Sequence, residues 1–201
     1  MNDRDLVKRY TDGDEGAFDA LYDRYRTPLY GYLVSLSRSR ELAEELLQET
    51  FLTFIRQALK RGSKLLESAD GSPIDGGAKP ILFRIARSRW IDRSRVDQRR
   101  FRAMESRASD PSFLRDDRNE APWAVDASLD ADAMQSRLDG LPEEQRETLL
   151  LRAIGGLTFP EIGRLMGVSQ NTALSRFRYA TQKLRDAMSN ADTRTQRRDR
   201  R

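Results

Sequence analysis

The sequence predicts an all-α protein of two small helical domains, joined by a flexible acidic linker, with a helix-turn-helix in the C-terminal domain. Apolar residues recur at helical spacing in both halves of the chain, without strand-like alternation. Only 38% of the 201 residues are hydrophobic and 34% are charged, which suits small helical domains better than one thick core. The regular pattern fades between residues 103 and 128, where we place the linker.

The first domain, residues 1–102, is expected to start with short helices. An amphipathic turn around Leu6 and Val7 stops near Gly13. The pattern then continues to Pro28, which is expected to break or kink the helix because proline lacks an N–H group. We expect two or three helices here, packed antiparallel.

Residues 40–60 carry the clearest helical pattern, with Ser39 as the N-cap and Gly62 just past the end. The apolar stripe expected to face inward consists of Leu42, Leu46, Leu47, Phe51, Phe54, Ile55 and Leu59. The rest of the surface carries Glu44, Glu45, Gln48, Glu49 and Gln57. Such a row of carboxylates is either an ordinary solvated face or an acidic docking surface for a basic partner.

Residues 61–79 are expected to form a loop, because they contain four glycines and one proline. A loop of this length is either functional or disordered. An arginine-rich helix then begins near Pro80, with Ile81 and Leu82 facing inward. Its basic residues are Arg84, Arg87, Arg89, Arg93, Arg95, Arg99 and Arg100, interspersed with Phe83 and Trp90. Aromatic rings among arginines suit the stacking of unpaired bases, and the alternative is that both rings are core residues.

The charge distribution supports two separate contacts with nucleic acid. Residues 84–107 carry 9 basic and 3 acidic groups, and residues 164–201 carry 10 basic and 3 acidic groups. Between them, residues 109–147 carry 4 basic and 11 acidic groups, which phosphate would repel. Trp123 is unusual in such an acidic segment and would anchor it to a domain or a partner.

The second domain, residues 129–190, is expected to hold four helices. The first two are built on Leu129, Ala133, Leu138 and Leu141, and then on Leu149, Leu150, Ala153 and Ile154 after Pro142. Thr158 and Glu161 form a capping box for the third, although Pro160 leaves Phe159 as an alternative cap.

Gly167 ends the third helix and Ser169 caps the fourth, which gives a helix-turn-helix. Residues Ala173, Phe177, Ala180, Leu184 and Met188 are expected to face inward. A basic tail, residues 191–201, lacks apolar residues and is expected to be disordered. The alternative reading of this domain is an ordinary helical hairpin with a solvated face.

Composition argues against an enzyme. Cysteine and histidine are both absent, which excludes disulfides, cysteine nucleophiles and histidine-based catalytic or metal sites. We therefore expect no catalytic residue, no metal and no cofactor. The longest apolar runs are too short to span a bilayer and no signal peptide is evident, so we expect a soluble cytoplasmic protein.

Five segments resemble one family, the bacterial RNA polymerase sigma factors of the extracytoplasmic-function (ECF) type, within the sigma-70 family. The first domain resembles the polymerase-binding and −10 domain through AEELLQETFLTFIR at 43–56 and LFRIARSRWID at 82–92. The second resembles the −35 reader through LDGLPEEQRETLLLR at 138–152, GLTFPEIGRLMGVS at 156–169 and NTALSRFRYATQKLR at 171–185. The second domain alone would also suit a response-regulator effector.

The resemblance implies a sigma factor that binds core RNA polymerase and directs initiation at promoters, with an anti-sigma factor as a further partner in many members. The residues implied to dock on the clamp helices of the largest polymerase subunit are Glu45, Gln48 and Glu49. Those implied to bind −10 DNA are Arg84, Arg87, Ser88, Arg89, Trp90, Arg93 and Arg95, while the 61–79 loop would hold a flipped-out base. Those implied to read the −35 duplex are Ser169, Asn171, Thr172, Ser175, Arg176 and Arg178. Tyr179 and Thr181 stand where relatives often carry basic residues. The rival hypothesis is a free-standing regulator that binds operator DNA as a dimer without polymerase.

Overall fold

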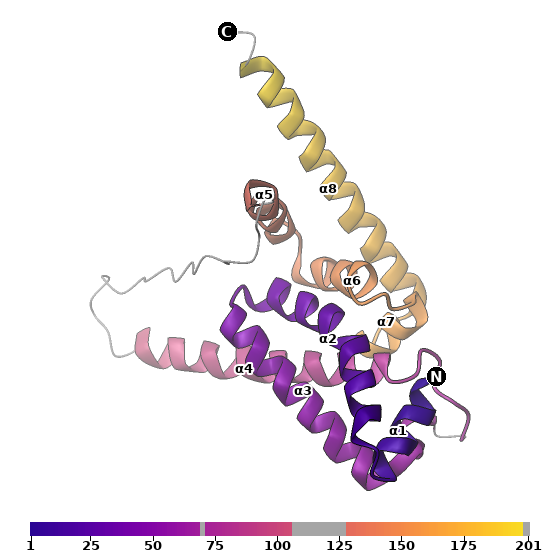
Figure 1. Cartoon of the computed structure of the whole chain (residues 1–201). Helices are drawn as coiled ribbons and strands as arrows, with labels where there is room; N and C mark the ends of the chain where they lie inside the picture. Colours follow the sequence, from indigo (N-terminus) through magenta and orange to yellow (C-terminus); the bar gives the residue numbers. More distant parts are fainter. Residues whose placement is uncertain (69–70, 106–127, 199–201) are drawn as a thin grey trace. The chain divides into compact units, whose positions relative to one another are not determined.

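The computed structural model describes residues 1–68, 71–105 and 128–198, and all regular secondary structure in these ranges is helical apart from one isolated β-bridge. The all-α prediction is confirmed. The chain divides into two compact units, Met1–Ala121 and Pro122–Arg201, and each is described by itself (Figure 1). Most of the expected linker, including Trp123, lies outside the described residues. In the described part of the chain, none of the helices has the length and apolar character needed to cross a membrane.

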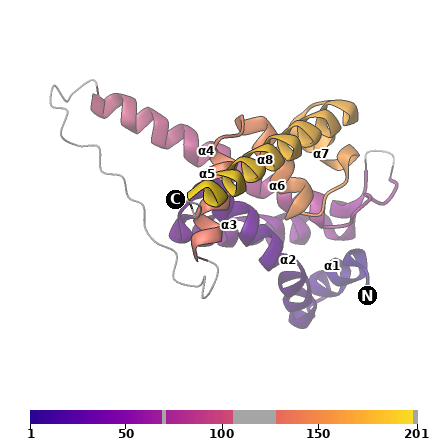
Figure 2. The ribbon, with the colours of Figure 1, turned by 90° about the horizontal axis from the view of Figure 1, so that it is seen from above.

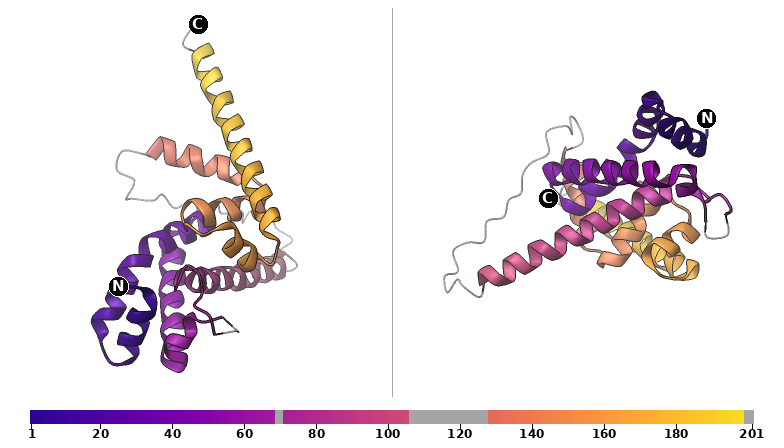
Figure 3. Two further views of the ribbon diagram at one scale, coloured as in Figure 1. Left: turned by 90° about the vertical axis from the view of Figure 1, so that its right-hand side faces the viewer. Right: turned by 90° about the horizontal axis from the view of Figure 1, so that it is seen from below.

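The first unit is a bundle of α-helices with one 3-10 turn. Its elements are α1 (Asp3–Thr11), α2 (Glu15–Ser37), α3 (Arg40–Arg61), η1 (Gly62–Leu66) and α4 (Lys79–Glu105). α3 packs between α2 and α4, and α1 packs against α2 and η1. The largest fully buried side chains in this unit are Leu6, Leu21, Leu29, Tyr32, Leu33, Phe54, Leu65, Leu82 and Phe83. The C-terminal part of α4 projects past α3, as the views from above and below show (Figures 2 and 3).

α2 continues through Pro28, so the expected break is absent, and the alternative of a kink stays a prediction. Proline removes one backbone donor, but buried residues on both sides of it, Tyr25 and Leu29 among them, hold the helix together. The packing of one long helical face outweighs the lost hydrogen bond. α2 ends at Arg38, which adopts the left-handed conformation with φ 57°.

α3 has the expected caps and an inner face that is narrower than expected. The Ser39 hydroxyl accepts a hydrogen bond from the Leu42 N–H at 3.2 Å, and Gly62 follows the last turn with φ 57°. Its buried residues are Ala43, Leu46, Leu47, Thr50, Phe51, Phe54 and Ala58. Leu59 was expected to face inward and is 60% exposed, because the helix contacts its neighbours along a narrower stripe than the sequence pattern indicates.

Residues 61–79 are more ordered than the expected loop. Leu65 and Leu66 of η1 are buried, and the Ile74 N–H donates to the Leu66 carbonyl at 2.8 Å. Glu67 and Pro73 form the isolated antiparallel bridge. Apart from residues 69–70, which are not described, this segment folds back on itself like a small hairpin.

The second unit contains α5 (Ser128–Asp139), α6 (Glu143–Ala153), α7 (Phe159–Met166) and α8 (Gln170–Arg198). α6 and α7 both pack against α8, whose C-terminal half projects away from them (Figures 1 and 3). The core residues are Leu138, Leu141, Leu149, Leu150, Leu151, Leu157, Ile162, Ala173 and Ala180. Ala153 was expected in this core and is exposed, whereas Leu151 is fully buried.

The turn between α7 and α8 has the chemistry of a helix-turn-helix. Thr158, not Phe159, caps α7, and Glu161 completes the capping box by accepting from the Thr158 N–H at 2.6 Å. Gly167 ends α7 with φ 70°, as expected. A Cβ at Gly163 would lie 2.8 Å from the Val168 carbonyl oxygen, so only glycine lets the two helices approach this closely.

α8 extends further than expected, because it includes residues 191–198 of the tail predicted to be disordered. No glycine or proline interrupts the sequence there, so no helix-breaking residue ends α8 earlier. Met188 was expected to face inward, but it is exposed where the helix has passed beyond α6 and α7.

Candidate nucleic-acid interface

The N-terminal half of α8 presents a polar face away from the core. Asn171, Ser175 and Arg178 are exposed. Ser169 and Thr172 are exposed too, but each also holds the first turn: the Ser169 hydroxyl accepts from the Thr172 N–H at 3.0 Å, and the two hydroxyl oxygens lie 2.9 Å apart. This face therefore offers amide, hydroxyl and guanidinium groups from a helix whose start is fixed by its own cap.

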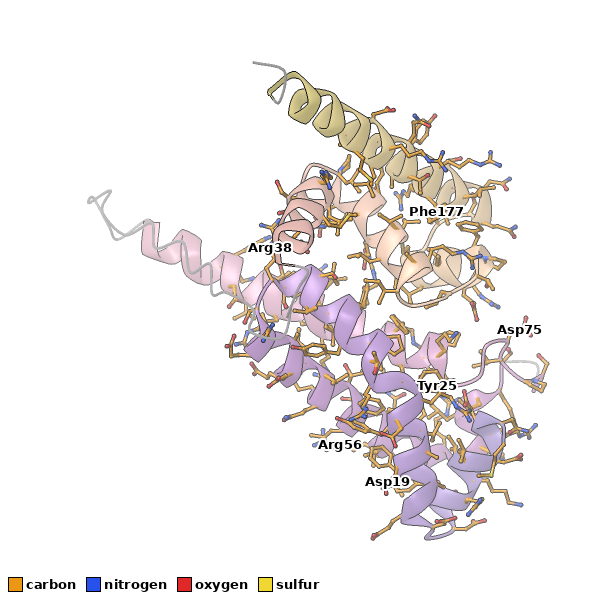
Figure 4. All side chains as sticks on the ribbon, turned by 45° about the horizontal axis from the view of Figure 1, so that its top comes forward. Asp19, Tyr25, Arg38, Arg56, Asp75 and Phe177 are labelled. Carbon is orange, nitrogen blue, oxygen red and sulfur yellow. The ribbon has the colours of Figure 1, made fainter. Side chains whose placement is uncertain are left out.

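The opposite face of α8 fixes how that polar face is presented. Ala173 and Ala180 are fully buried, and the ring centroids of Phe177 and Phe159 lie 5.5 Å apart (Phe177 is labelled in Figure 4). Arg176 is half-buried and forms an ion pair with Glu144 of α6. Five of the six residues predicted to read duplex DNA are thus exposed on α8 or at its N-cap. The sixth, Arg176, is half-buried beside Glu144.

In the first unit, α4 divides its predicted nucleic-acid residues between surface and core. Arg84, Ser88 and Arg95 are exposed, and Arg87 and Trp90 are half-buried. Phe83 is fully buried, with its ring centroid 5.3 Å from that of Tyr32. Phe83 is thus a core residue, whereas the half-buried Trp90 keeps surface for stacking.

Two of the predicted DNA-binding arginines contact two of the predicted polymerase-docking glutamates. Arg93 Nη1 lies 3.1 Å from Glu45 Oε1. Arg89 Nε lies 3.8 Å from Glu49 Oε2, and Arg89 also donates to the Thr53 hydroxyl at 2.9 Å. Gln48 is exposed between the two glutamates. The two sites that the sequence suggests separately are therefore one continuous surface on α3 and α4.

A groove of about 390 Å³ runs between α3 and α4. Thr53 and Gln57 line it from α3, and Arg84, Ser88, Arg89 and Asp92 line it from α4. Thr53 and Asp92 are not among the residues that the sequence predicts for this site. A signal for Thr53 does exist in the sequence, because Glu49, Thr53 and Gln57 follow each other at i, i+4 and i+8 and so share one face of the helix.

The described ranges contain no candidate metal site. No group of three or more acidic side chains there is arranged to hold a metal ion. The exposed polar groups of α8 are hydrogen-bond donors, acceptors and cations, which suits binding to phosphates and base edges, whereas the surface of α3 and α4 carries its arginines beside the carboxylates Glu45, Glu49 and Asp92.

Two family descriptions match this chain, one in each unit. "Sigma-70 region 2" matches residues 21–63, which span most of α2 and α3. "Sigma-70, region 4" matches residues 131–184, which include the helix-turn-helix. The matched regions therefore contain the candidate docking glutamates and the exposed face of α8, respectively.

Curated relatives and solved structures agree with these matches. The chain is 30% identical over 184 residues to the RNA polymerase sigma factor CarQ of Myxococcus xanthus, covering 90% of this chain and 95% of that protein. It is 29% identical over 188 residues to the ECF RNA polymerase sigma factor SigK of Mycobacterium ulcerans, covering 91% of each chain.

The fold is similar to that of CnrH, solved in complex with the cytosolic domain of CnrY, with a TM-score of 0.63 at 23% identity over 94% of this chain and 98% of that chain. It is also similar to the sigma factor RpoE of Bartonella quintana, solved with the anti-sigma factor NepR, with a TM-score of 0.58 at 24% identity over 86% of this chain and 96% of that chain. On the sequence relationship, with the two helical units in the same order along the chain, the protein belongs to the ECF-type RNA polymerase sigma factors of the sigma-70 family.

Proposed function

We propose that this chain is a promoter-specificity subunit. It binds core RNA polymerase and directs initiation by holding a −35 duplex and a strand-separated −10 element. The observation that carries the proposal is the presence of regions 2 and 4 on one chain that covers 95% of the length of a protein named an RNA polymerase sigma factor. It performs no covalent chemistry in this role, and it acts where the polymerase is, in the cytoplasm.

At −35, α8 enters the major groove with its N-terminal half. Asn171, Ser175 and Arg178 are exposed there and reach base edges or phosphates, and Arg176 adds a second guanidinium. Ser169 and Thr172 have hydroxyls engaged in the cap, so they contribute through phosphate contacts near the helix start. Each good base contact in such an interface discriminates by about 1–3 kcal/mol.

At −10, α4 holds the melted non-template strand along Arg84, Arg87, Ser88, Arg89, Arg93 and Arg95. Trp90 provides the stacking surface, and Phe83 has no part in it because it is buried. The groove between α3 and α4 lies in the same stretch of surface. Binding free energy, and no chemical step, keeps the strand separated.

Polymerase docking uses the exposed acidic side of α3. Glu45, Gln48 and Glu49 present two carboxylates and an amide to a basic helical surface on the largest subunit. Since Glu45 and Glu49 already neighbour Arg93 and Arg89, docking and −10 binding use adjacent groups. An anti-sigma protein is a further expected partner, by analogy with the complex of RpoE with the anti-sigma factor NepR.

The decisive experiment is gel filtration with purified core polymerase, followed by transcription in vitro from a promoter library. We expect co-elution, and transcripts that depend on both a −35 and a −10 element. If the chain instead fails to co-elute and binds a palindromic duplex tightly as a dimer, it is a free-standing regulator and the proposal is wrong.

A further inference from the structure

Tyr179 is a large aromatic side chain that α8 presents to solvent. It is 67% exposed, compared with 45% for Met188 further along the same helix. The two phenylalanines of this unit behave differently, because Phe159 and Phe177 pack together with ring centroids 5.5 Å apart. Exposure of a single apolar side chain is common, so the position of this ring on the helix decides what it can do.

Tyr179 shares one face of α8 with two of the predicted −35 residues. Asn171, Ser175 and Tyr179 follow each other at i, i+4 and i+8, and all three are exposed. Eight helical steps place the ring about 12 Å along the axis from Asn171. That length corresponds to about three or four base pairs of duplex. A helix that lies in the major groove with Asn171 and Ser175 therefore brings Tyr179 to the same groove.

The chemistry of this face changes just beyond Tyr179. Gln182 and Asp186, one and two turns further along, are also exposed, and Gln182 Nε2 donates to Asp186 Oδ1 at 2.9 Å. The contact engages the Gln182 amide, and phosphate repels the Asp186 carboxylate. The part of the face that suits DNA therefore extends from Asn171 to about Tyr179.

A tyrosine ring offers DNA a different contact from the polar residues before it. It carries no charge, and it cannot make the paired hydrogen bonds that arginine makes to guanine or asparagine makes to adenine. It has a flat apolar body that ends in one hydroxyl group. Among the four bases, thymine presents an apolar group in the major groove, its C5-methyl. The body of the ring therefore matches thymine better than any other base.

We propose that Tyr179 is a specificity-determining residue of the −35 face and that its ring recognises the C5-methyl group of one thymine. The inference rests on the proposed function and deepens it, because it names the base and the chemical group that one position of α8 reads. The exposed neighbour Arg178 supplies a phosphate contact that an uncharged ring does not.

The test removes the methyl group from the DNA and the ring from the protein, separately and together. Holoenzyme made from core polymerase and the full chain is titrated with promoter duplexes that carry thymine at each −35 position in turn. Each thymine is then replaced by deoxyuridine, which lacks only the methyl group. For the wild type, this replacement is expected to weaken binding about fourfold at one position, the scale of one buried methyl group. At that position, 5-methylcytosine should bind more tightly than cytosine by a similar factor.

Two variants of Tyr179 and one control complete the comparison. Tyr179→Ala is expected to bind thymine and deoxyuridine promoters equally, because the ring is gone. Tyr179→Phe keeps the ring and should keep the fourfold difference. Since the side chain is exposed, both variants should retain the wild-type Tm and affinity for core polymerase. Met188→Ala removes another exposed apolar side chain of α8, beyond the part that suits DNA, and should leave the difference unchanged.

The inference is overturned if the wild type depends on the −35 element but responds to deoxyuridine at none of its positions, or if Tyr179→Ala keeps the wild-type response. Loss of the response in Tyr179→Phe would assign the contact to the hydroxyl and has the same meaning. If wild-type holoenzyme bound promoters with and without a −35 element equally, the proposed function would fail, and the inference with it.

Discussion

The two candidate DNA-binding faces differ in how far their arginines already contact carboxylates of the same chain. On α8, Asn171, Ser175 and Arg178 are exposed and point away from a buried alanine face. On the surface of α3 and α4, Arg89 and Arg93 already contact Glu49 and Glu45. The exposed residues of α8 can therefore contact a ligand in the free chain, whereas the positive charges on α3 and α4 are partly neutralised by neighbouring carboxylates.

This difference fits the ligand that each face would meet. Duplex DNA is a regular, stiff target, so a helix fixed by caps and packing can read it without rearrangement. In the proposed function a melted strand is met only with polymerase bound, and polymerase would engage the same glutamates, Glu45 and Glu49, that Arg93 and Arg89 contact. Exposed ion pairs are worth about 0–1 kcal/mol, so exchanging them costs little.

The largest expected effect comes from breaking the preformed face. Gly163→Ala places a Cβ 2.8 Å from the Val168 carbonyl oxygen, and we expect it to destabilise the α7–α8 turn by about 1–3 kcal/mol. Hydrogen exchange of α7 and α8 amides measures the loss, together with −35-dependent promoter binding. Gly140→Ala is the matched control, because its Cβ would meet the Arg137 carbonyl at an ordinary 3.4 Å. Normal protection of α7 and α8 in Gly163→Ala would contradict the packing argument.

A smaller effect is expected from the one −35 arginine that is paired. Arg176→Ala should weaken use of −35-containing promoters by about tenfold, or about 1.4 kcal/mol, without changing affinity for core polymerase. Filter binding of holoenzyme to promoters with and without the −35 element measures it. Glu144→Gln, which releases Arg176 from its partner, should keep or increase −35 affinity. Equal losses in both variants would mean that the pair serves the fold alone.

On the surface of α3 and α4, replacing the carboxylates Glu45 and Glu49 should affect DNA binding and polymerase binding in opposite directions. Glu45→Gln with Glu49→Gln removes the α3 carboxylates that contact Arg93 and Arg89, so the free chain should bind a −10 single strand about two- to fivefold more tightly at low salt. The same variant should bind core polymerase more weakly. Fluorescence anisotropy with a labelled oligonucleotide measures the first effect and gel filtration the second. Glu44→Gln, an exposed carboxylate of the same helix, is the control. Unchanged polymerase affinity in the double variant would show that the docking assignment is wrong.

The smallest expected effect concerns a position where the −35 face lacks a cation. Tyr179 is 67% exposed on α8, next to Arg178. Tyr179→Lys should add one phosphate contact and steepen the salt dependence of duplex binding by a slope of about 0.9, with stability changed by less than about 0.5 kcal/mol. Titrations at several salt concentrations measure the slope. An unchanged slope would place Tyr179 outside the DNA-facing surface.

Local features of this fold were predictable from sequence. The Ser39 cap, the Thr158–Glu161 box and the Gly167 turn involve groups within a few residues of each other, where residue type decides conformation. The exposed face of α8 followed from helical spacing once its start was known. Even here, the contact between Gly163 and Val168 was not foreseen.

Long-range features were not predictable. Asp3 meets Ala78 across 75 residues and Arg93 meets Glu45 across 48, so both contacts depend on how the helices pack. The same reason explains the error at Leu59, whose apolar side chain fits the helical pattern but has no neighbouring helix to cover it. Periodicity gives the faces of a helix, and only packing decides how wide the buried face is.

Because α8 is one continuous helix, a tilt of its first turns displaces its far end. At about 1.5 Å per step, the helix from Asn171 to exposed Met188 extends about 26 Å along one axis. A fluorophore attached at position 188 would move by about 2 Å for each tilt of about 5° at the first turns of the helix. Small differences in the orientation of α8 on different promoters would thus appear as displacements of a label at the far end of the helix.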